Sequence, residues 1–114
     1  MTSTEISNRI KSSRKYIEVR ESLISQLRAT GADTPTFLSL IDDYMNFWVI
    51  KEQTKIDIAV HGVYIEYNNG GGQSGVKENP SVAYQLKLSS QMLKILQQLK
   101  LDVESAGGAA DDEL

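Results

Sequence analysis

The chain has 114 residues, of which 40% are hydrophobic and 24% charged, and this predicts one small soluble globular domain. It contains no cysteine, which excludes disulfides, thiolate metal sites and cysteine nucleophiles. The net charge of −3 argues against a nucleic-acid-binding protein that is basic over its whole surface.

Apolar residues at helical spacing predict a first long helix over residues 5–29. Thr2 and Glu5 have the spacing of a capping box at its start, and Gly31 follows its last periodic residue. Two serines and several long basic side chains weaken the first half. We therefore expect residues 1–13 to form a partly frayed basic segment.

A second and longer helix is predicted from Phe37 to Val60. Thr34 as the N-cap and Pro35 at the first helical position define its start, and Gly62 ends it. Its apolar arc is too broad for one packing partner. With the first helix it should form a long antiparallel helical hairpin.

A small β-hairpin and a third helix complete the predicted fold. The hairpin covers about residues 63–78, with a glycine-rich turn between two short strands. Asn79 and Pro80 repeat the combination of cap and proline and start the last helix. We predict a mainly α protein with a single helical oligomerisation domain over residues 14–103, followed by a disordered acidic tail at 104–114.

The glycine-rich turn imitates nucleotide-binding motifs. Gly70 to Gly75 fits the G-x-G-x-x-G pattern, but no second parallel strand follows the last helix, as a dinucleotide fold requires. The phosphate-loop pattern fails because the lysine is one position late and Glu78 follows it instead of Ser or Thr. We therefore predict that these glycines are structural and that the protein holds no nucleotide cofactor.

Single polar residues do not form a catalytic or metal-binding pattern. His61 is the only histidine, and we interpret it as a polar residue at a helix C-terminus, where a partial positive charge suits the helix dipole. Asp42 and Asp43 have the residue types of a carboxylate pair, but we interpret them as solvated acids. The prediction is a non-enzyme without metal or cofactor.

Both long helices at the centre and end of the chain carry more apolar surface than one small domain buries, which predicts self-association. Trp48 lies among these residues and has an alternative as a base-stacking platform, although its helical spacing favours packing. The candidates for core or subunit packing are Ile41, Tyr44, Met45, Trp48, Leu86, Met92, Leu93 and Leu96.

Charge is distributed unevenly along the chain, with bases gathered in residues 9–20 and acids in residues 102–114. The basic residues spread around the predicted helix, which suits phosphate contacts better than base readout. The alternative is a solvated helix start. The candidate DNA-binding residues are Arg9, Lys11, Arg14, Lys15 and Arg20, with Lys51, Lys55 and Lys77 as further candidates.

Several stretches together resemble the small terminase subunit family of tailed phages and prophages, over about residues 14–101. The resemblance rests on Asp42-Asp43-Tyr44-Met45 with Trp48 and Lys51, Gly62-Val63, Glu66-Tyr67-Asn68-Asn69-Gly70-Gly71-Gly72-Gln73-Ser74-Gly75, Lys77, Asn79-Pro80-Ser81 and Gln91-Met92-Leu93-Lys94-Ile95-Leu96.

The resemblance implies a non-enzymatic part of a DNA-packaging motor. Such subunits form homo-oligomeric rings, bind duplex viral DNA, and recruit and regulate the large subunit that supplies ATPase and nuclease. One departure is that many of them begin with a helix-turn-helix, for which the residues before Gly31 are too few. The alternative is a protein-only adaptor that does not bind DNA itself.

The sequence shows neither a membrane-spanning stretch nor a signal peptide, and this bears on its cellular location. No stretch approaches the ~20 apolar residues that span a bilayer, and the N-terminus has no apolar signal-peptide core. We therefore expect no membrane association, and with the resemblance we expect the cytoplasm of the bacterial host.

Overall fold

The computed structural model describes residues 1–101, which form four helices and one two-stranded antiparallel hairpin. The fold is mainly α, as predicted. The elements are α1 (Ser3–Lys11), α2 (Arg14–Ala29), α3 (Pro35–His61), β1 (Tyr64–Gly70), β2 (Gln73–Glu78) and α4 (Pro80–Gln98). The predicted acidic tail lies outside the described residues.

The N-terminal part forms two helices, so the prediction of one helix over residues 5–29 was wrong. Ser12 Oγ donates to the Asn8 carbonyl at 2.9 Å, and Ser13 Oγ accepts from the Tyr16 amide at 3.2 Å. Serine side chains that bond to nearby backbone groups compete with a continuous helix. Ser13 therefore caps α2, while Thr2 caps α1 as predicted.

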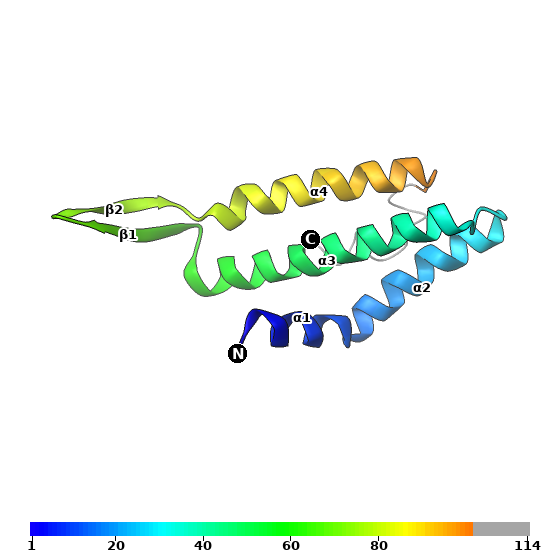
Figure 1. Cartoon of the computed structure of the whole chain (residues 1–114), viewed down its shortest axis with the longest axis horizontal. Coiled ribbons are helices and arrows are strands. Elements are labelled where there is room, and N and C mark those ends of the chain that lie inside the picture. The colour runs from blue at the N-terminus through cyan, green and yellow to red at the C-terminus, as the bar shows by residue number, and fades with distance from the viewer. Residues whose placement is uncertain (102–114) are drawn as a thin grey trace.

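Helices α3 and α4 lie side by side and antiparallel and form the body of the molecule, while α1 and α2 run along α3 (Figure 1). Both predicted starts are confirmed. The Thr34 side chain accepts from the Phe37 amide before Pro35, and the Asn79 side chain accepts from the Ser81 amide before Pro80. Gly62 ends α3 at a φ of 88°, which glycine adopts without a Cβ penalty.

The core lies where α2 and α4 pack against α3. It buries six of the eight side chains predicted to pack, namely Ile41, Tyr44, Met45, Trp48, Met92 and Leu96. The other two are exposed on α4 of the single chain, Leu86 to 69% and Leu93 to 46%. They are not core residues of one chain, and whether they contact another subunit stays a prediction.

The hairpin extends away from the helices along the long axis of the molecule (Figure 1). Its strands pair from Tyr64 opposite Glu78 to Gly70 opposite Gln73, which agrees with the prediction. Tyr67 crosses the hairpin over Gly75, where an added Cβ would lie 2.9 Å from the tyrosine hydroxyl. An isolated two-stranded hairpin is marginally stable in water, so the contact of the Tyr67 ring with Gly75 helps to stabilise the strand pair.

Candidate nucleic-acid interface

Five of the eight basic candidates gather where α1 meets α2. Arg9 and Lys11 lie in the last turn of α1, and Arg14 and Lys15 open α2, with Arg20 little more than one turn further on. The break at Ser12 and Ser13 joins the C-terminal end of one helix to the N-terminal end of the next. We name these five residues the junction cluster.

The bases at the two helix ends interact differently with the helix dipoles. Arg9 and Lys11 suit the negative end of the α1 dipole, whereas Arg14 and Lys15 lie at the positive end of α2, whose first turn has no acid. Bases at a helix N-terminus oppose the dipole, so these two charges do not stabilise α2 through its dipole. Backbone N–H groups and cations at the same end favour an anion.

Glu21 neutralises little of the charge of Arg20. Arg20 is 3.9 Å from Glu21, a long contact between side chains that are 41% and 64% exposed. Exposed pairs of this kind contribute little. Arg9, Lys11 and Arg14 are exposed to solvent, and Lys15 is partly exposed.

The remaining three candidates lie apart from the junction cluster. Lys51 is only 8% exposed, inside the contact of α3 with its neighbours, so its position does not suit phosphate contact. Lys55 Nζ lies 3.0 Å from Glu52 on the same helix. Lys77 lies on the hairpin with its ammonium 6.0 Å from the centre of the Tyr67 ring. The structure therefore does not bring the eight into one site.

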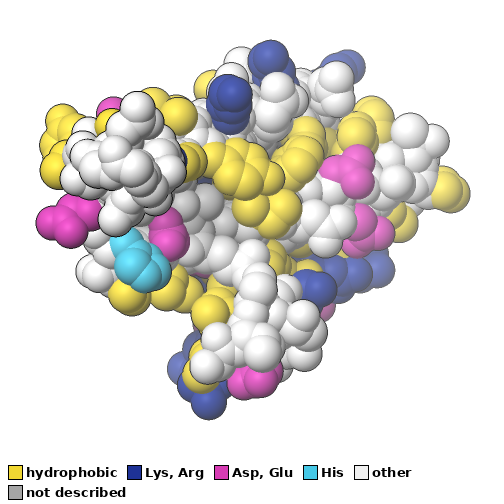
Figure 2. All heavy atoms as spheres, turned by 60° about the vertical axis from the view of Figure 1, so that its left-hand side comes forward, with side chains coloured by type: hydrophobic (Ala, Val, Ile, Leu, Met, Phe, Trp, Pro, Cys, Tyr) yellow, Lys and Arg dark blue, Asp and Glu magenta, His cyan; other side chains and the backbone are white. Residues whose placement is uncertain are grey.

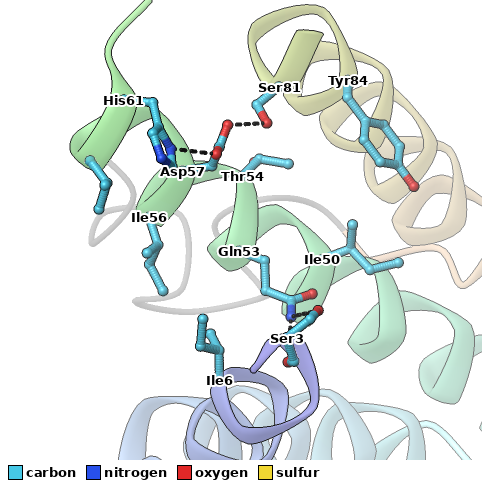
Figure 3. A pocket seen from close by; sticks show the side chains of 11 residues that line it. Ser3, Ile6, Ile50, Gln53, Thr54, Ile56, Asp57, His61, Ser81 and Tyr84 are labelled. Carbon is cyan, nitrogen blue, oxygen red and sulfur yellow. Dashed lines mark hydrogen bonds and ion pairs between the residues drawn. The ribbon is translucent and has the colours of Figure 1, made fainter. Parts of the chain in front are cut away.

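A second polar cluster, absent from the predictions, joins the end of α3 to the start of α4. Asp57 accepts from Ser81 Oγ at 2.7 Å, and its other oxygen lies 2.9 Å from His61 Nδ1 (Figure 3). The oxygen bonded to Ser81 also accepts from Asn79 Nδ2 at 2.9 Å. Asn79 also bonds to the Gly62 carbonyl. The i, i+4 spacing of Asp57 and His61 was a sequence signal for one of these contacts.

This cluster holds the base of the hairpin and has no nucleophile with a base. Both Ser81 and His61 bond to Asp57 instead of to each other, whereas a hydrolase needs the histidine next to the serine. Within residues 1–101 no three His, Asp or Glu side chains are placed to hold a metal ion. The hydrogen bonds from Ser81, then Asn79, then His61 lower the pKa of Asp57 from its usual 3.8.

Replacing Asp57 by Asn should destabilise the protein at neutral pH by about 1 kcal/mol, since the amide loses charge-assisted hydrogen bonds at a partly exposed site. A lowered pKa means that the carboxylate stabilises the fold above the unfolded pKa of about 4, and this is lost as pH falls through the folded pKa. Urea unfolding from pH 7 to pH 2 measures it. A difference between variant and wild type that does not shrink in acid contradicts this role.

An apolar groove of about 520 Å³ lies beside this cluster, between α1, α3 and the start of α4. Ile6, Ile50, Ile56, Val60 and Tyr84 supply its apolar lining (Figure 3). Gln53 Nε2 donates to the Ser3 carbonyl at 3.1 Å and ties α1 to its side. We name this feature the α3 groove.

A comparison with protein-family models finds that the model described as phage terminase, small subunit, matches residues 17–111. The chain belongs to the phage terminase small-subunit family. A search of the curated proteins and a search of the solved structures each found no match. The terminase small-subunit match covers most of α2 together with α3, the hairpin and α4, and it confirms the resemblance found in the sequence.

Membership of the terminase small-subunit family implies a role in DNA packaging and a protein that is not an enzyme, as predicted. Four members of the junction cluster, Arg9 to Lys15, precede the matched residues, so the match says nothing of them. A role for them in DNA binding is a proposal that rests on the geometry. No helix among the described residues has the length and apolarity of a membrane span.

Proposed function

We propose that this terminase small subunit assembles into a homo-oligomeric ring and binds duplex viral DNA through its phosphates. It recruits and regulates the large terminase subunit, which supplies the ATPase and nuclease, in the cytoplasm of the bacterial host. The observation that supports DNA binding is the junction cluster, with four bases where two helix ends meet and Arg20 further along α2.

Phosphate contact fits the junction cluster better than base readout. One face of α2 packs in the core through Val19, Leu23 and Leu27, and its outer face carries Glu18 and Glu21. Those carboxylates would repel a duplex that lay along the helix. The N-terminal end of α2 is free of acids in its first turn, so the duplex backbone meets that end.

Assembly strengthens such contacts. The junction cluster of one copy has five bases, and each neutralised phosphate releases only about one counterion. Five such contacts are few for tight binding at physiological salt. Several junction clusters on one assembly act on the same duplex with a high effective concentration. A ring therefore binds DNA that a single chain holds weakly.

A protein-only adaptor is the second candidate, and the net charge of −3 favours it. Such an adaptor contacts the large subunit and has no affinity of its own for DNA.

Fluorescence anisotropy of a labelled duplex, titrated with the purified protein at several salt concentrations, separates the two functions. We expect binding that weakens steeply with salt. Absence of binding at ~50 mM salt selects the adaptor. Light scattering on the same sample tests the ring, since a mass equal to one chain contradicts assembly.

A further inference from the structure

Helix α4 presents an apolar ridge that the chain does not cover. Leu86 and Leu93 are seven residues apart and therefore lie on one face, about two turns from each other. Each is followed by a lysine, Lys87 and Lys94, and α4 contains no acidic residue. We name these four residues the α4 ridge.

The α3 groove is the complementary surface. Val60 is 69% exposed, Tyr84 48% and Ile56 41%, so its lining is apolar and open to solvent. Figure 2 shows hydrophobic side chains gathered at the centre of the face that the hairpin end brings forward, with acidic side chains beside them.

Charge favours contact between the two surfaces. Asp57 lies among the α3 residues that line the groove, and Asp43 lies on the same face of α3 about two turns before Ile50, where the α3 part of the lining begins. The lysines of the α4 ridge carry the opposite sign. Two α4 ridges facing each other would place four lysines together without an acid from either helix, which disfavours a symmetric contact.

One chain cannot fill its own groove with its own ridge. At about 100° per residue, Leu86 and Leu93 lie about 140–160° around α4 from Leu88, which is 3% exposed and marks the buried side of this helix. Tyr84, which lines the groove, lies only about 40° from Leu88. Ridge and groove therefore use different sides of the molecule.

We infer that the α4 ridge of one copy lies in the α3 groove of a second copy. The lengths agree, since Leu86 to Leu93 spans about 10 Å and Ile50 to Val60 about 15 Å of helix. A contact between two different surfaces is head to tail, and repetition of it closes a ring or extends a filament. The inference rests on the self-assembly in the proposed function and specifies its interface.

Two variants and their mixture test this contact by light scattering. The double change Leu86→Asp and Leu93→Asp replaces the two apolar side chains of the ridge by charged ones. Val60→Asp places a charge in the apolar lining of the groove. All three positions are exposed in the single chain. We expect each variant alone to be monomeric. An equimolar mixture should form dimers and nothing larger, because one partner keeps a groove and the other keeps a ridge.

Val76→Asp is the matched control, since this hairpin valine is 65% exposed against 69% for Val60. It should assemble as wild type does. Reversing the charge of Lys87 and Lys94 to Glu touches no apolar side chain and should weaken assembly about tenfold.

The outcomes separate this inference from the proposed function. A mixture that stays monomeric, or a Val60→Asp variant that assembles normally, overturns the ridge-in-groove contact but leaves the ring. Equal loss of assembly in the Val76→Asp control overturns it as well. A wild-type protein that is itself monomeric overturns both the contact and the ring.

Discussion

Replacing Arg14, Lys15 and Arg20 together by alanine is expected to weaken duplex binding about 100-fold at ~0.1 M salt. Each base that contacts a phosphate releases close to one counterion, so the slope of log affinity against log salt should also fall by about 2 to 3. Arg14 is exposed at the N-terminal end of α2, and Lys15 and Arg20 are partly exposed. Anisotropy over a series of salt concentrations measures both quantities.

A second triple variant that loses the same number of positive charges controls for the effect of net charge on DNA binding. Arg28→Ala, Lys77→Ala and Lys100→Ala remove three positive charges outside the junction cluster. We expect less than a threefold change in affinity, since screening is effective beyond about 10 Å at this salt. Equal losses in the two variants mean that net charge governs binding and that the junction cluster is not the DNA site. Loss in the control alone points instead to Lys77 on the hairpin.

Local signals made much of this fold predictable. Thr34 before Pro35 and Asn79 before Pro80 identified two helix starts, because a capping side chain and a proline at the first helical position act within one turn. The local sequence at Ser12 and Ser13 does not decide between a continuous helix and a break. Serine is tolerated inside a helix and also caps one, and here the packing of both helices against α3 selects the break.

The candidate site was predictable only where its members are neighbours in sequence. The junction cluster is local, so composition revealed it. Lys51 has the same chemistry but lies on the packed side of α3, and the pattern within one helix does not show which side its neighbours cover. The contacts of Asp57 with Asn79 and Ser81 cross from one helix to the next and carry no spacing signal along the chain.

Trp48→Ala should be the most destabilising of these single changes, lowering the free energy of unfolding by about 3–5 kcal/mol. Trp48 is 2% exposed and packs edge to face against Tyr16, with ring centres 5.8 Å apart, so it joins α2 to α3. Small domains have free energies of unfolding of only about 5–15 kcal/mol, so urea unfolding should show that the variant is only marginally stable.

Trp48→Phe separates packing from the alternative role in base stacking. The indole Nε1 has no hydrogen-bond partner among the described residues, so phenylalanine removes a buried polar group while keeping an aromatic contact with Tyr16. The gain from removing an unsatisfied donor offsets part of the lost volume, and we expect a net cost of about 1 kcal/mol. DNA affinity should be unchanged, because a side chain this deeply buried cannot stack on a base. A loss of affinity in a fully folded Trp48→Phe protein contradicts this expectation and means that the indole takes part in DNA binding, either directly or by positioning α2.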